Sequence, residues 1–408
     1  MQIPFSPPYI DEDVLHEVMQ TLQSGWITTG PKVKALEDLT AEMTQVEKAL
    51  CVNSWTSGAL LVFKWLGIGK GDEVIVPAYT YAATALAVMQ TGAKPVMVDI
   101  QDDFTIDPLK IQAAITPATK AVLTVDVGGW PCNYDEINAI LNSHDVKQQF
   151  ISGNEIQKRF GRPALIADAA HSFGALYNGY PATLASDITI YSLHAVKNIT
   201  TAEGGVICLN LPTQFSKADV YAWMKLNSMN GQTADALTKS QKGNWKYDII
   251  YDGLKINMTD VCAAIGLAQM RKYTSNLLPE RQRVYDHYTS FFKDREWAII
   301  PNGQNKQKQS SYHLYMLRIK GISEEQRDTI IQLMTGTGAS ANVHFVPLPM
   351  LTLFKNKGYA INDYPTAYSN YAVEISLPIY PQLTNEQCTF IEEQIEKAYN
   401  AVVYDKAP

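Results

Sequence analysis

The sequence predicts an α/β protein in which a mainly parallel sheet is covered by helices and is followed by a smaller α+β domain. Short apolar runs alternate with amphipathic segments from about residue 48 to 210, as is typical of parallel strands joined by helices. After residue 210 the pattern is helical, and from about residue 295 strands and helices alternate again. At 408 residues the chain also exceeds one ordinary core of ~100–200 residues, so two domains are expected.

Seven short apolar runs fit the strands of the large sheet. They are KALCVNS (48–54), DEVIVPAY (72–79), KPVMVDI (94–100), KAVLTVDV (120–127), PALIADAA (163–170), DITIYSL (187–193) and GGVICLN (204–210). Amphipathic segments at 58–67 and 108–115 fit helices between them. Ligands of parallel sheets bind beyond the carboxyl ends of the strands, so we expect the functional site there.

The last part of the chain predicts a compact α+β arrangement. Residues 259–273 are small and apolar on most faces, which indicates a buried helix, and residues 279–294 carry regularly spaced charges. The following elements are a strand at 312–319, a helix at 323–336, a second strand at 340–347 and a closing helix at 384–402 that begins with a capping box. The polar stretch 302–310 predicts an exposed loop. We divide the chain into a large domain (1–270) and a small domain (271–408).

Composition excludes several classes of function. The net charge of −7, with no cluster of Lys and Arg, argues against a nucleic-acid partner. No run approaches the ~20 apolar residues of a membrane span, and the N-terminus lacks the pattern of a secretory signal. The cysteines are scattered, without CxxC pairs or metal-ligand spacing: Cys51, Cys132, Cys208, Cys262 and Cys388. We therefore expect a cytoplasmic protein with reduced cysteines and no metal site.

The stretch 186–206 holds the first candidate for chemistry. A strand ends at Ser192, Lys197 follows five residues later, and a double glycine leads into the next strand. A lysine in a loop facing the ligand crevice can form an imine with an aldehyde if burial lowers its pKa. The alternative interpretation of Lys197 is a solvated surface lysine.

A second candidate is Asp168, at which the apolar strand that begins near residue 163 ends. A half-buried carboxylate is costly without a cationic partner, and a protonated pyridine nitrogen would be such a partner. The alternative is a helix N-cap, since an aspartate before Ala-Ala also fits that role.

A third candidate is the start of the helix after the first strand, where Thr56, Ser57 and Gly58 follow one another. Free backbone N–H groups and the helix dipole would hold a phosphate there, although Ser and Thr are also ordinary caps. A lysine, an acid and a phosphate cradle at three strand ends together indicate a pyridoxal phosphate site.

Longer motifs carry a family resemblance over nearly the whole chain. They are SGWITTGPKVKALE (24–37), IGKGDEVIVPAYTY (68–81), AKPVMVDI (93–100), ADAAHSFGA (167–175), SLHAVKNITTAEGGV (192–206), GLKINMTDVCAAIGLAQ (253–269) and NVHFVPL (342–348). In these blocks the chain resembles the DegT/StrS family of nucleotide-sugar aminotransferases, and most closely the branch that aminates 4-keto-arabinose on UDP. The resemblance implies the fold of type I pyridoxal-phosphate aminotransferases.

The resemblance also implies roles for residues around the cofactor. Lys197 matches the Schiff-base lysine, and Asp168 matches the acid that pairs with the pyridine nitrogen. His171 matches a residue near the 3-hydroxyl of the cofactor, and Tyr81 matches the aromatic stacked on its ring, with a core aromatic as the alternative. His194, in the lysine loop, is a further catalytic candidate, with a histidine satisfied by backbone groups as the alternative.

Other matches concern the phosphate and the substrate. Ser192 and the amides of Thr56, Ser57 and Gly58 correspond to phosphate contacts, and Asn257 corresponds to a contact reaching in from the second subunit of a homodimer with shared active sites. Four residues correspond to substrate contacts: Trp26, Thr28, Thr29 and His344.

The implied reaction has two halves. An amino acid, L-glutamate in the family, leaves its amino group on the cofactor as pyridoxamine phosphate, and a keto sugar on a nucleotide then accepts it. The product is an amino sugar nucleotide for polysaccharide or glycoconjugate biosynthesis. Two alternatives stay open, an aminotransferase for a cyclic ketone such as a keto-inositol and a sugar dehydratase, although the dehydratases of this fold carry histidine in place of Lys197. A non-catalytic protein on the same scaffold would be expected to lose Lys197 or Asp168.

Four features depart from the family pattern. Trp55 stands where many relatives have a small residue, Asp126 replaces a strand-end histidine, and Pro349 replaces a second histidine after His344. The segment 144–163 is longer than the corresponding segment of the arabinose-type relatives. We expect these changes mostly where the substrate is met.

Overall fold

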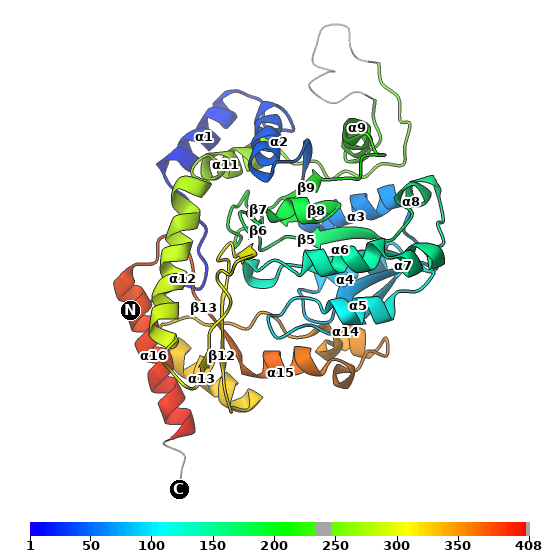
Figure 1. The fold of residues 1–408 in the computed structure, drawn as a ribbon. Helices are drawn as coiled ribbons and strands as arrows, with labels where there is room; N and C mark the ends of the chain where they lie inside the picture. Colours follow the sequence, from blue (N-terminus) through cyan, green and yellow to red (C-terminus); the bar gives the residue numbers. More distant parts are fainter. Residues whose placement is uncertain (234–245, 405–408) are drawn as a thin grey trace.

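A mixed sheet forms the centre of the molecule in the computed structural model, which describes residues 1–233 and 246–404. In spatial order its strands are β1 (Lys48–Val52), β9 (Gly205–Leu209), β8 (Ile188–Ser192), β5 (Ala164–Asp168), β4 (Thr119–Val125), β2 (Glu73–Pro77) and β3 (Lys94–Val98). Only β9 runs against the others in this sheet. All seven predicted strands are therefore present, and the predicted fold class is confirmed (Figure 1).

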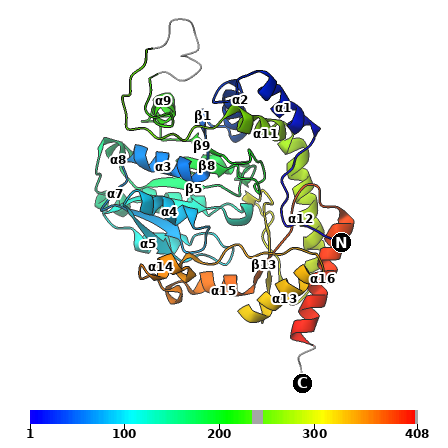
Figure 2. The ribbon, with the colours of Figure 1, turned by 180° about the vertical axis from the view of Figure 1, so that it is seen from behind.

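Helices cover both faces of this sheet (Figures 1 and 2). The helices up to the end of the sheet region are α1 (Glu12–Gln23), α2 (Pro31–Thr44), α3 (Trp55–Leu66), α4 (Ala83–Gln90), α5 (Pro108–Ala114), α6 (Tyr134–Asn142), α7 (His144–Gln149), α8 (Glu155–Phe160), α9 (Lys217–Asn227) and α11 (Asp260–Met270). Val74 and Val76 of β2 pack with α3 and α4, while Ile75 between them packs with α5 and α6. This alternation is what a strand buried on both faces requires.

Helix α3 shows why the chain turns where it does. Its first turn is capped by Ser54, whose hydroxyl accepts the N–H of Ser57, and it ends at Gly67, which has a φ of +65°. Both are standard helix signals, because a serine side chain satisfies a free N–H and glycine adopts positive φ without strain. The predicted buried helix near 259–273 is α11, which packs against α1 and α2 at one end of the sheet (Figure 1).

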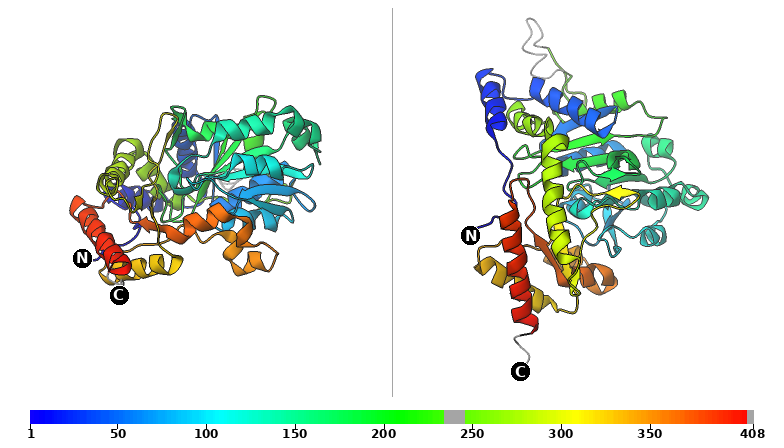
Figure 3. Two further views of the ribbon diagram at one scale, coloured as in Figure 1. Left: turned by 60° about the horizontal axis from the view of Figure 1, so that its bottom comes forward. Right: turned by 60° about the vertical axis from the view of Figure 1, so that its left-hand side comes forward.

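A second, smaller sheet lies beyond the first. It contains β10 (Ala298–Ile299), β12 (Tyr315–Ile319) and β13 (Glu374–Leu377), all antiparallel. The remaining helices are α12 (Leu278–Phe292), α13 (Glu324–Gly336), α14 (Thr352–Lys355), α15 (Pro365–Val373) and α16 (Asn385–Val403). α12 runs from the end that holds α11 to the small sheet, where it lies beside α16 (Figure 3). Both predicted capped helices, α13 and α16, begin with capping boxes.

The N-terminal segment belongs to the core of this smaller sheet. Ile3 pairs with Ala339 and is buried in the same core as Tyr288 and Ile391. The division of the chain at residue 270 stays a prediction.

Two predictions for this region are wrong. Residues 340–347 do not form a strand: Asn342 makes a single bridge to Ser376, and the strand beside β12 is β13. The polar stretch 302–310 is not simply an exposed loop, because β11 (Lys308–Gln309) pairs with β6 (Leu176–Tyr177), which pairs with β7 (Tyr180–Pro181). Polar composition hid this strand, since its lysine is buried by partners that are distant in sequence.

Candidate active site

A cavity of about 550 Å³ opens at the carboxyl ends of the central strands. Asp168 ends β5 and Ser192 ends β8, and the loop after β8 brings Lys197 to the same place. The predicted residues that line the cavity are Thr56, Tyr81, Asp168, His171, Ser192, His194, Lys197 and His344. The expectation of a site at the strand ends thus agrees with the geometry.

Asp168 is a buried carboxyl group facing this cavity. It accepts hydrogen bonds from Thr84 Oγ1 at 2.8 Å and from the N–H of Ala170 at 3.2 Å. Burial nevertheless raises the pKa of Asp168 to about 7, against the effect of these bonds and of the charge on Lys197. The bond from the N–H of Ala170 fits the capping alternative. Because burial disfavours the charged form of Asp168, however, a cation beside the carboxyl group would stabilise that form.

Lys197 is a poorly solvated amine in the same cavity. Burial lowers the pKa of Lys197 to about 8, and the nearby charge on Asp168 offsets only part of that effect. Within residues 1–233 and 246–404, its Nζ makes no hydrogen bond or ion pair. A lysine that is partly neutral near physiological pH is a competent nucleophile and base.

His171 and His344 also face the cavity as neutral rings. The N–H of Gly128 donates to His171 Nδ1 at 3.2 Å, so the neutral ring of His171 carries its proton on Nε2. Burial lowers the pKa of His171 well below its ordinary value and lowers the pKa of His344 to about 4. The Nδ1 atom of His344 lies 2.9 Å from Ser376 Oγ, and its ring stacks on Phe5.

The helix start contributes less to a phosphate cradle than the sequence predicts. The N–H of Ser57 donates to Ser54 Oγ at 3.1 Å, and the N–H of Gly58 donates to Ser54 O at the same distance. A Cβ on Gly58 would meet the side chains of Ile190 and Ile207, so this glycine serves packing on the sheet. Ser57 and Gly58 do not line the cavity, whereas Thr56 does. The missed signal was Ser54, an N-cap serine two residues after β1.

His194 and Tyr81 lie at the open side of the cavity. His194 is exposed, with Nε2 3.6 Å from Glu203 Oε1. Tyr81 is 65% exposed, and its ring centroid lies 5.9 Å from that of Phe345. Tyr81 is therefore not a core aromatic, which removes the alternative interpretation of this residue.

Asn257 and three predicted substrate residues lie together but do not line this cavity. Asn257 Nδ2 donates to Thr29 Oγ1 at 2.6 Å, and Trp26 Nε1 donates to the carbonyl of Thr29 at 3.2 Å. Thr28 belongs to the same segment, and its carbonyl accepts the N–H of Asp260 at 3.2 Å. These residues form a separate group at the start of α11.

The departures from the family pattern fall mostly outside the cavity, and the expectation that they meet the substrate stays a prediction. Trp55 does line it, with its indole N–H donating to the carbonyl of Ile190 at 3.1 Å. Pro349 is buried in a short turn at 348–350. In the segment 144–163, the side chains of Asn154 and Gln157 donate to the carbonyl of Leu66, so this segment caps the end of α3.

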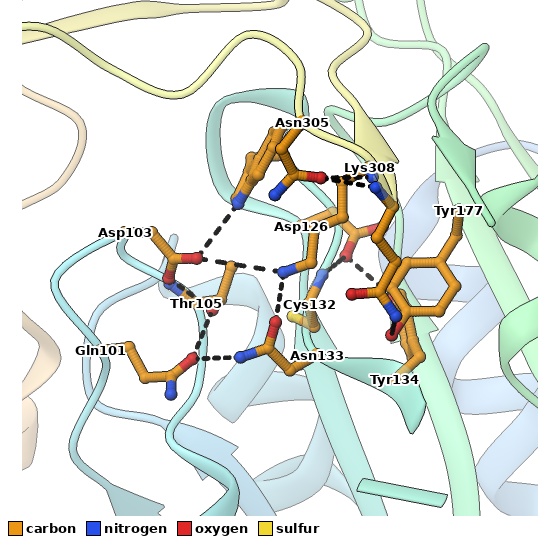
Figure 4. Close-up of polar contacts among 12 residues, drawn as sticks. Gln101, Asp103, Thr105, Asp126, Cys132, Asn133, Tyr134, Tyr177, Asn305 and Lys308 are labelled. Carbon is orange, nitrogen blue, oxygen red and sulfur yellow. Dashed lines mark hydrogen bonds and ion pairs between the residues drawn. The ribbon is translucent and has the colours of Figure 1, made fainter. Parts of the chain in front are cut away.

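Asp126 is likewise a structural residue (Figure 4). It is buried at the end of β4 and accepts bonds from the N–H of Cys132 at 2.9 Å and the hydroxyl of Tyr134 at 2.8 Å on one oxygen. Ser172 Oγ donates to the other oxygen at 2.8 Å. The carboxylate thus ties the strand end to the segments that follow β4 and β5 in the chain.

Figure 4 also shows how the mispredicted strand β11 is held. Lys308 donates from Nζ to Asn133 Oδ1, lies 4.0 Å from Asp103 Oδ2 and sits over the ring of Trp130. The backbone N–H of Lys308 donates to Asn305 Oδ1 at 2.7 Å.

Several cavity residues were not predicted from the sequence. They include Phe5, Ser6, Ser54, Thr84, Glu203, His313, Asn342 and Phe345. Most come from segments remote from the lysine loop, so only the fold brings them there. The sequence did contain one usable signal, since His313 lies in the predicted strand 312–319 as an unexplained histidine.

The cavity fits the pyridoxal phosphate that the sequence leads us to expect. A buried carboxyl with a pKa of about 7 would ionise beside a pyridine nitrogen, and a lysine with a pKa of about 8 can react with an aldehyde. Thr56 and Ser192 offer hydroxyl and backbone N–H donors for the phosphate. Among the described residues, no group of three or more His, Cys, Asp or Glu side chains could hold a metal ion. No helix in the described part of the chain is long and apolar enough to cross a membrane.

Comparisons with known proteins give one consistent result. Residues 8–396 match the model of the DegT/DnrJ/EryC1/StrS aminotransferase family. The chain is 31% identical to the spore coat polysaccharide biosynthesis protein SpsC of Bacillus subtilis, with 96% of each chain covered. It is 34% identical to the uncharacterized protein MJ1066 of Methanocaldococcus jannaschii, over 96% of this chain and 97% of that one.

A solved structure is also very similar. The putative sugar aminotransferase Spr1654 from Streptococcus pneumoniae in its PMP form is 41% identical, with a TM-score of 0.94 over 98% of this chain and 100% of that chain. Its PLP form is 39% identical, with a TM-score of 0.94 over 99% of this chain and 100% of that chain.

Proposed function

Because the chain belongs to the DegT/DnrJ/EryC1/StrS aminotransferase family, we propose that it moves an amino group from L-glutamate to a keto sugar carried on a nucleotide. The type I aminotransferase fold, the pyridoxal phosphate cofactor and the general activity of a sugar aminotransferase are established by the comparisons. The amino donor, the nucleotide and the place of the product in polysaccharide or glycoconjugate biosynthesis are our proposals. The resemblance to SpsC, a polysaccharide biosynthesis protein, supports the last of them.

Lys197 carries the proposed chemistry. When bound, the cofactor supplies an aldehyde that can hold an amino group and a ring that can accept an electron pair. The neutral Nζ of Lys197 takes the proton from Cα of the amino acid and later delivers a proton to the sugar carbon that receives the amine. The lowered pKa of Lys197, about 8, is the observation that supports this role most directly.

Three other residues orient the cofactor in this proposal. Asp168 would hold the ring nitrogen and keep it protonated, because a cation there would lower the energetic cost of a buried carboxylate. His171 would donate from Nε2 to the 3-oxygen, and Tyr81, which is exposed at the cavity mouth, would cover one face of the ring. We keep His194 as a weaker catalytic candidate, because its exposed position suits a contact with substrate.

The sequence predicts four residues of one chain as phosphate contacts, and we propose that two of them contact the phosphate directly. We assign the phosphate to Ser192 and to the side chain and N–H of Thr56, which line the cavity. Ser57 and Gly58 support this site indirectly, because their N–H groups are bonded to Ser54.

We further propose a homodimer in which Asn257 reaches the partner's phosphate. Asn257 lies outside its own cavity, together with Trp26, Thr28 and Thr29, so all four are available to a second subunit. An apolar stripe at Leu15, Met19 and Leu22 supports this arrangement, because residues at this spacing share one helix face and here they are about half exposed. A two-fold interface would make each such contact twice.

The state of the cysteines supports a proposed location. All five are free, and four of them are buried, as expected for a reducing compartment. We therefore place the enzyme in the cytoplasm.

The test uses the holoenzyme and defined compounds. The protein is incubated with L-glutamate and a panel of 4-keto and 3-keto sugars on UDP, dTDP or GDP, together with a keto-inositol, and the products are identified by mass spectrometry. We expect one sugar nucleotide to gain an amine in exchange for its keto oxygen while 2-oxoglutarate accumulates. Amination of the keto-inositol alone would contradict the nucleotide-sugar assignment, and a strict requirement for another amino acid would contradict glutamate.

A further inference from the structure

His313 faces the cavity and has no assigned role. It precedes β12, is only 5% exposed and lines the same cavity as Lys197 and Asp168. Burial lowers the pKa of His313 well below its ordinary value, so its ring is neutral at physiological pH. A neutral imidazole has one donor and one acceptor nitrogen, and its tautomer decides which of them meets a ligand.

Asn198, the residue after Lys197, fixes that tautomer. Its Nδ2 donates to Ser311 O at 2.9 Å and to Tyr273 Oη at 3.1 Å. Tyr273 uses its own proton on the carbonyl of Phe173, so its oxygen can accept. The amide of Asn198 cannot be turned around without losing both bonds, and its Oδ1 therefore faces His313 Nδ1 at 2.8 Å.

The oxygen of Asn198 can only accept, so His313 Nδ1 carries the proton and Nε2 carries a lone pair. His313 Nε2 makes no bond to a described residue, and it is not sealed in the interior, so it is open to the cavity. The protein thus presents a bare acceptor nitrogen next to the reactive lysine.

His171 complements this nitrogen. Its ring lies 4.3 Å from that of His313, centroid to centroid, with 35° between the planes. Because His171 Nδ1 accepts the N–H of Gly128, His171 offers an N–H to the cavity, whereas His313 offers a lone pair. One ring is thus a hydrogen-bond donor and the adjacent ring is an acceptor, so the two can bind different groups of a ligand.

We propose that His313 is a sugar-recognition residue whose Nε2 accepts a hydrogen bond from a hydroxyl of the acceptor sugar. The carboxylates of an amino acid donor and the cofactor's phosphate lack a proton to give, so neither is a partner for a bare nitrogen. A keto sugar carries hydroxyl groups close to its reacting carbon. This inference rests on the proposed function and adds a specificity contact to it.

The test compares His313→Phe with wild type, because phenylalanine keeps a ring against His171 but removes the acceptor. His144→Phe, at an exposed histidine of α7, is the matched control. The substrate is the sugar nucleotide that wild type aminates, with one deoxy analogue for each sugar hydroxyl. We expect His313→Phe to retain the cofactor spectrum, the melting temperature and the rate with glutamate, and to lose about 10- to 100-fold in kcat/KM for the sugar. On one deoxy analogue wild type should fall to the level of His313→Phe, and the variant should lose nothing more.

A second measurement reads the tautomer without activity. Nitrogen NMR of holoenzyme labelled with 15N-histidine, compared with the spectrum of His313→Phe, should show His313 with a protonated Nδ1 and a bare Nε2. A proton on Nε2, or a charged ring, would overturn the assignment.

Kinetic outcomes separate the possible failures. Equal losses with glutamate and with every sugar would mean that His313 only holds Asn198, and unchanged kcat/KM for the sugar would also reject the contact. If wild type aminates no sugar nucleotide, the proposed function fails, and the hydroxyl contact is rejected with it.

Discussion

Lys197 and Asp168 line one cavity and can carry opposite charges, but burial affects both groups more than their mutual attraction does. Burial lowers the pKa of the lysine to about 8 and raises the pKa of the carboxyl to about 7. Each group therefore has a substantial neutral fraction near neutral pH. The pair suits a ligand that brings both an aldehyde for the amine and a basic ring nitrogen for the acid.

Replacing Lys197 should stop turnover. Lys197→Ala removes the amine that reacts with the cofactor and moves protons, so we expect no detectable amination and loss of the visible absorption of the resting enzyme. Borohydride reduction of wild type followed by peptide mapping should fix the cofactor to Lys197. Lys110→Ala, at an exposed lysine, is the control and should behave as wild type. A cofactor tag on any other lysine would disprove the assignment.

The charge on Asp168 should matter more than its size. Asp168→Asn keeps the shape but cannot stabilise a protonated ring nitrogen, so we expect the glutamate half-reaction to slow by about 100-fold or more while cofactor still binds. Stopped-flow absorbance measures this half-reaction directly. Near-normal rates would mean that Asp168 acts only as a cap for Ala170.

The depressed pKa of Lys197 gives a pH dependence with a definite sign. Only the neutral amine attacks an aldehyde, so the rate at which cofactor-free protein captures pyridoxal phosphate should rise with pH and level off above about 8, not near the ~10.4 of an ordinary lysine. Asp168→Asn removes the anion that favours the charged amine, and should shift the midpoint to lower pH. The rate is followed by absorbance between pH 6 and 10. A wild-type midpoint above 10 would show that the lysine is solvated.

The fold was predictable where the signal is local. Each strand of the large sheet is a short apolar run, and α16 begins at a capping box, so neither needs knowledge of distant contacts. β11 was missed because Lys308 is polar in sequence and is buried by side chains such as Asn133 and Trp130, more than 170 residues away.

The same distinction between local signals and distant contacts explains which site residues could be predicted. Lys197 and Asp168 lie at strand ends and could be found by pattern, whereas His313 acquires its role from Asn198, whose orientation depends on residues 273 and 311. We expected Asp126 near the substrate because it replaces a strand-end histidine of the family pattern, and it does follow β4 directly. The structure shows that its carboxylate is consumed by three internal donors, and a sequence pattern does not reveal that.

Asp126 should accordingly affect stability and not recognition. Asp126→Ala leaves the hydroxyls of Tyr134 and Ser172 and the N–H of Cys132 without their acceptor, so we expect a loss of about 2–4 kcal/mol in the free energy of unfolding. Urea denaturation measures it, and Asp102→Ala, at an exposed position, is the control. At a temperature where the variant is folded, the KM for the sugar should be unchanged, and a selective rise in that KM would return Asp126 to the substrate site.

Complementation between two inactive variants tests the shared site. Lys197→Ala lacks the reactive amine, and Asn257→Phe would block the contact proposed to cross to the partner, so each homodimer should be inactive or nearly so. In a heterodimer, one site pairs the intact lysine of one chain with the intact asparagine of the other, while the second site carries both changes. Differently tagged variants allow the heterodimer to be purified after subunit exchange, and we expect about half the wild-type activity from it, since one of its two sites works. A heterodimer of two differently tagged Lys197→Ala chains is the control and should stay inactive.

Asn257 also holds Thr29 within its own chain, so the melting temperature of Asn257→Phe is measured first to confirm that it folds. If that variant is folded and inactive, and the purified mixed dimer is inactive too, Asn257 acts on the site of its own chain and the two-subunit site is wrong.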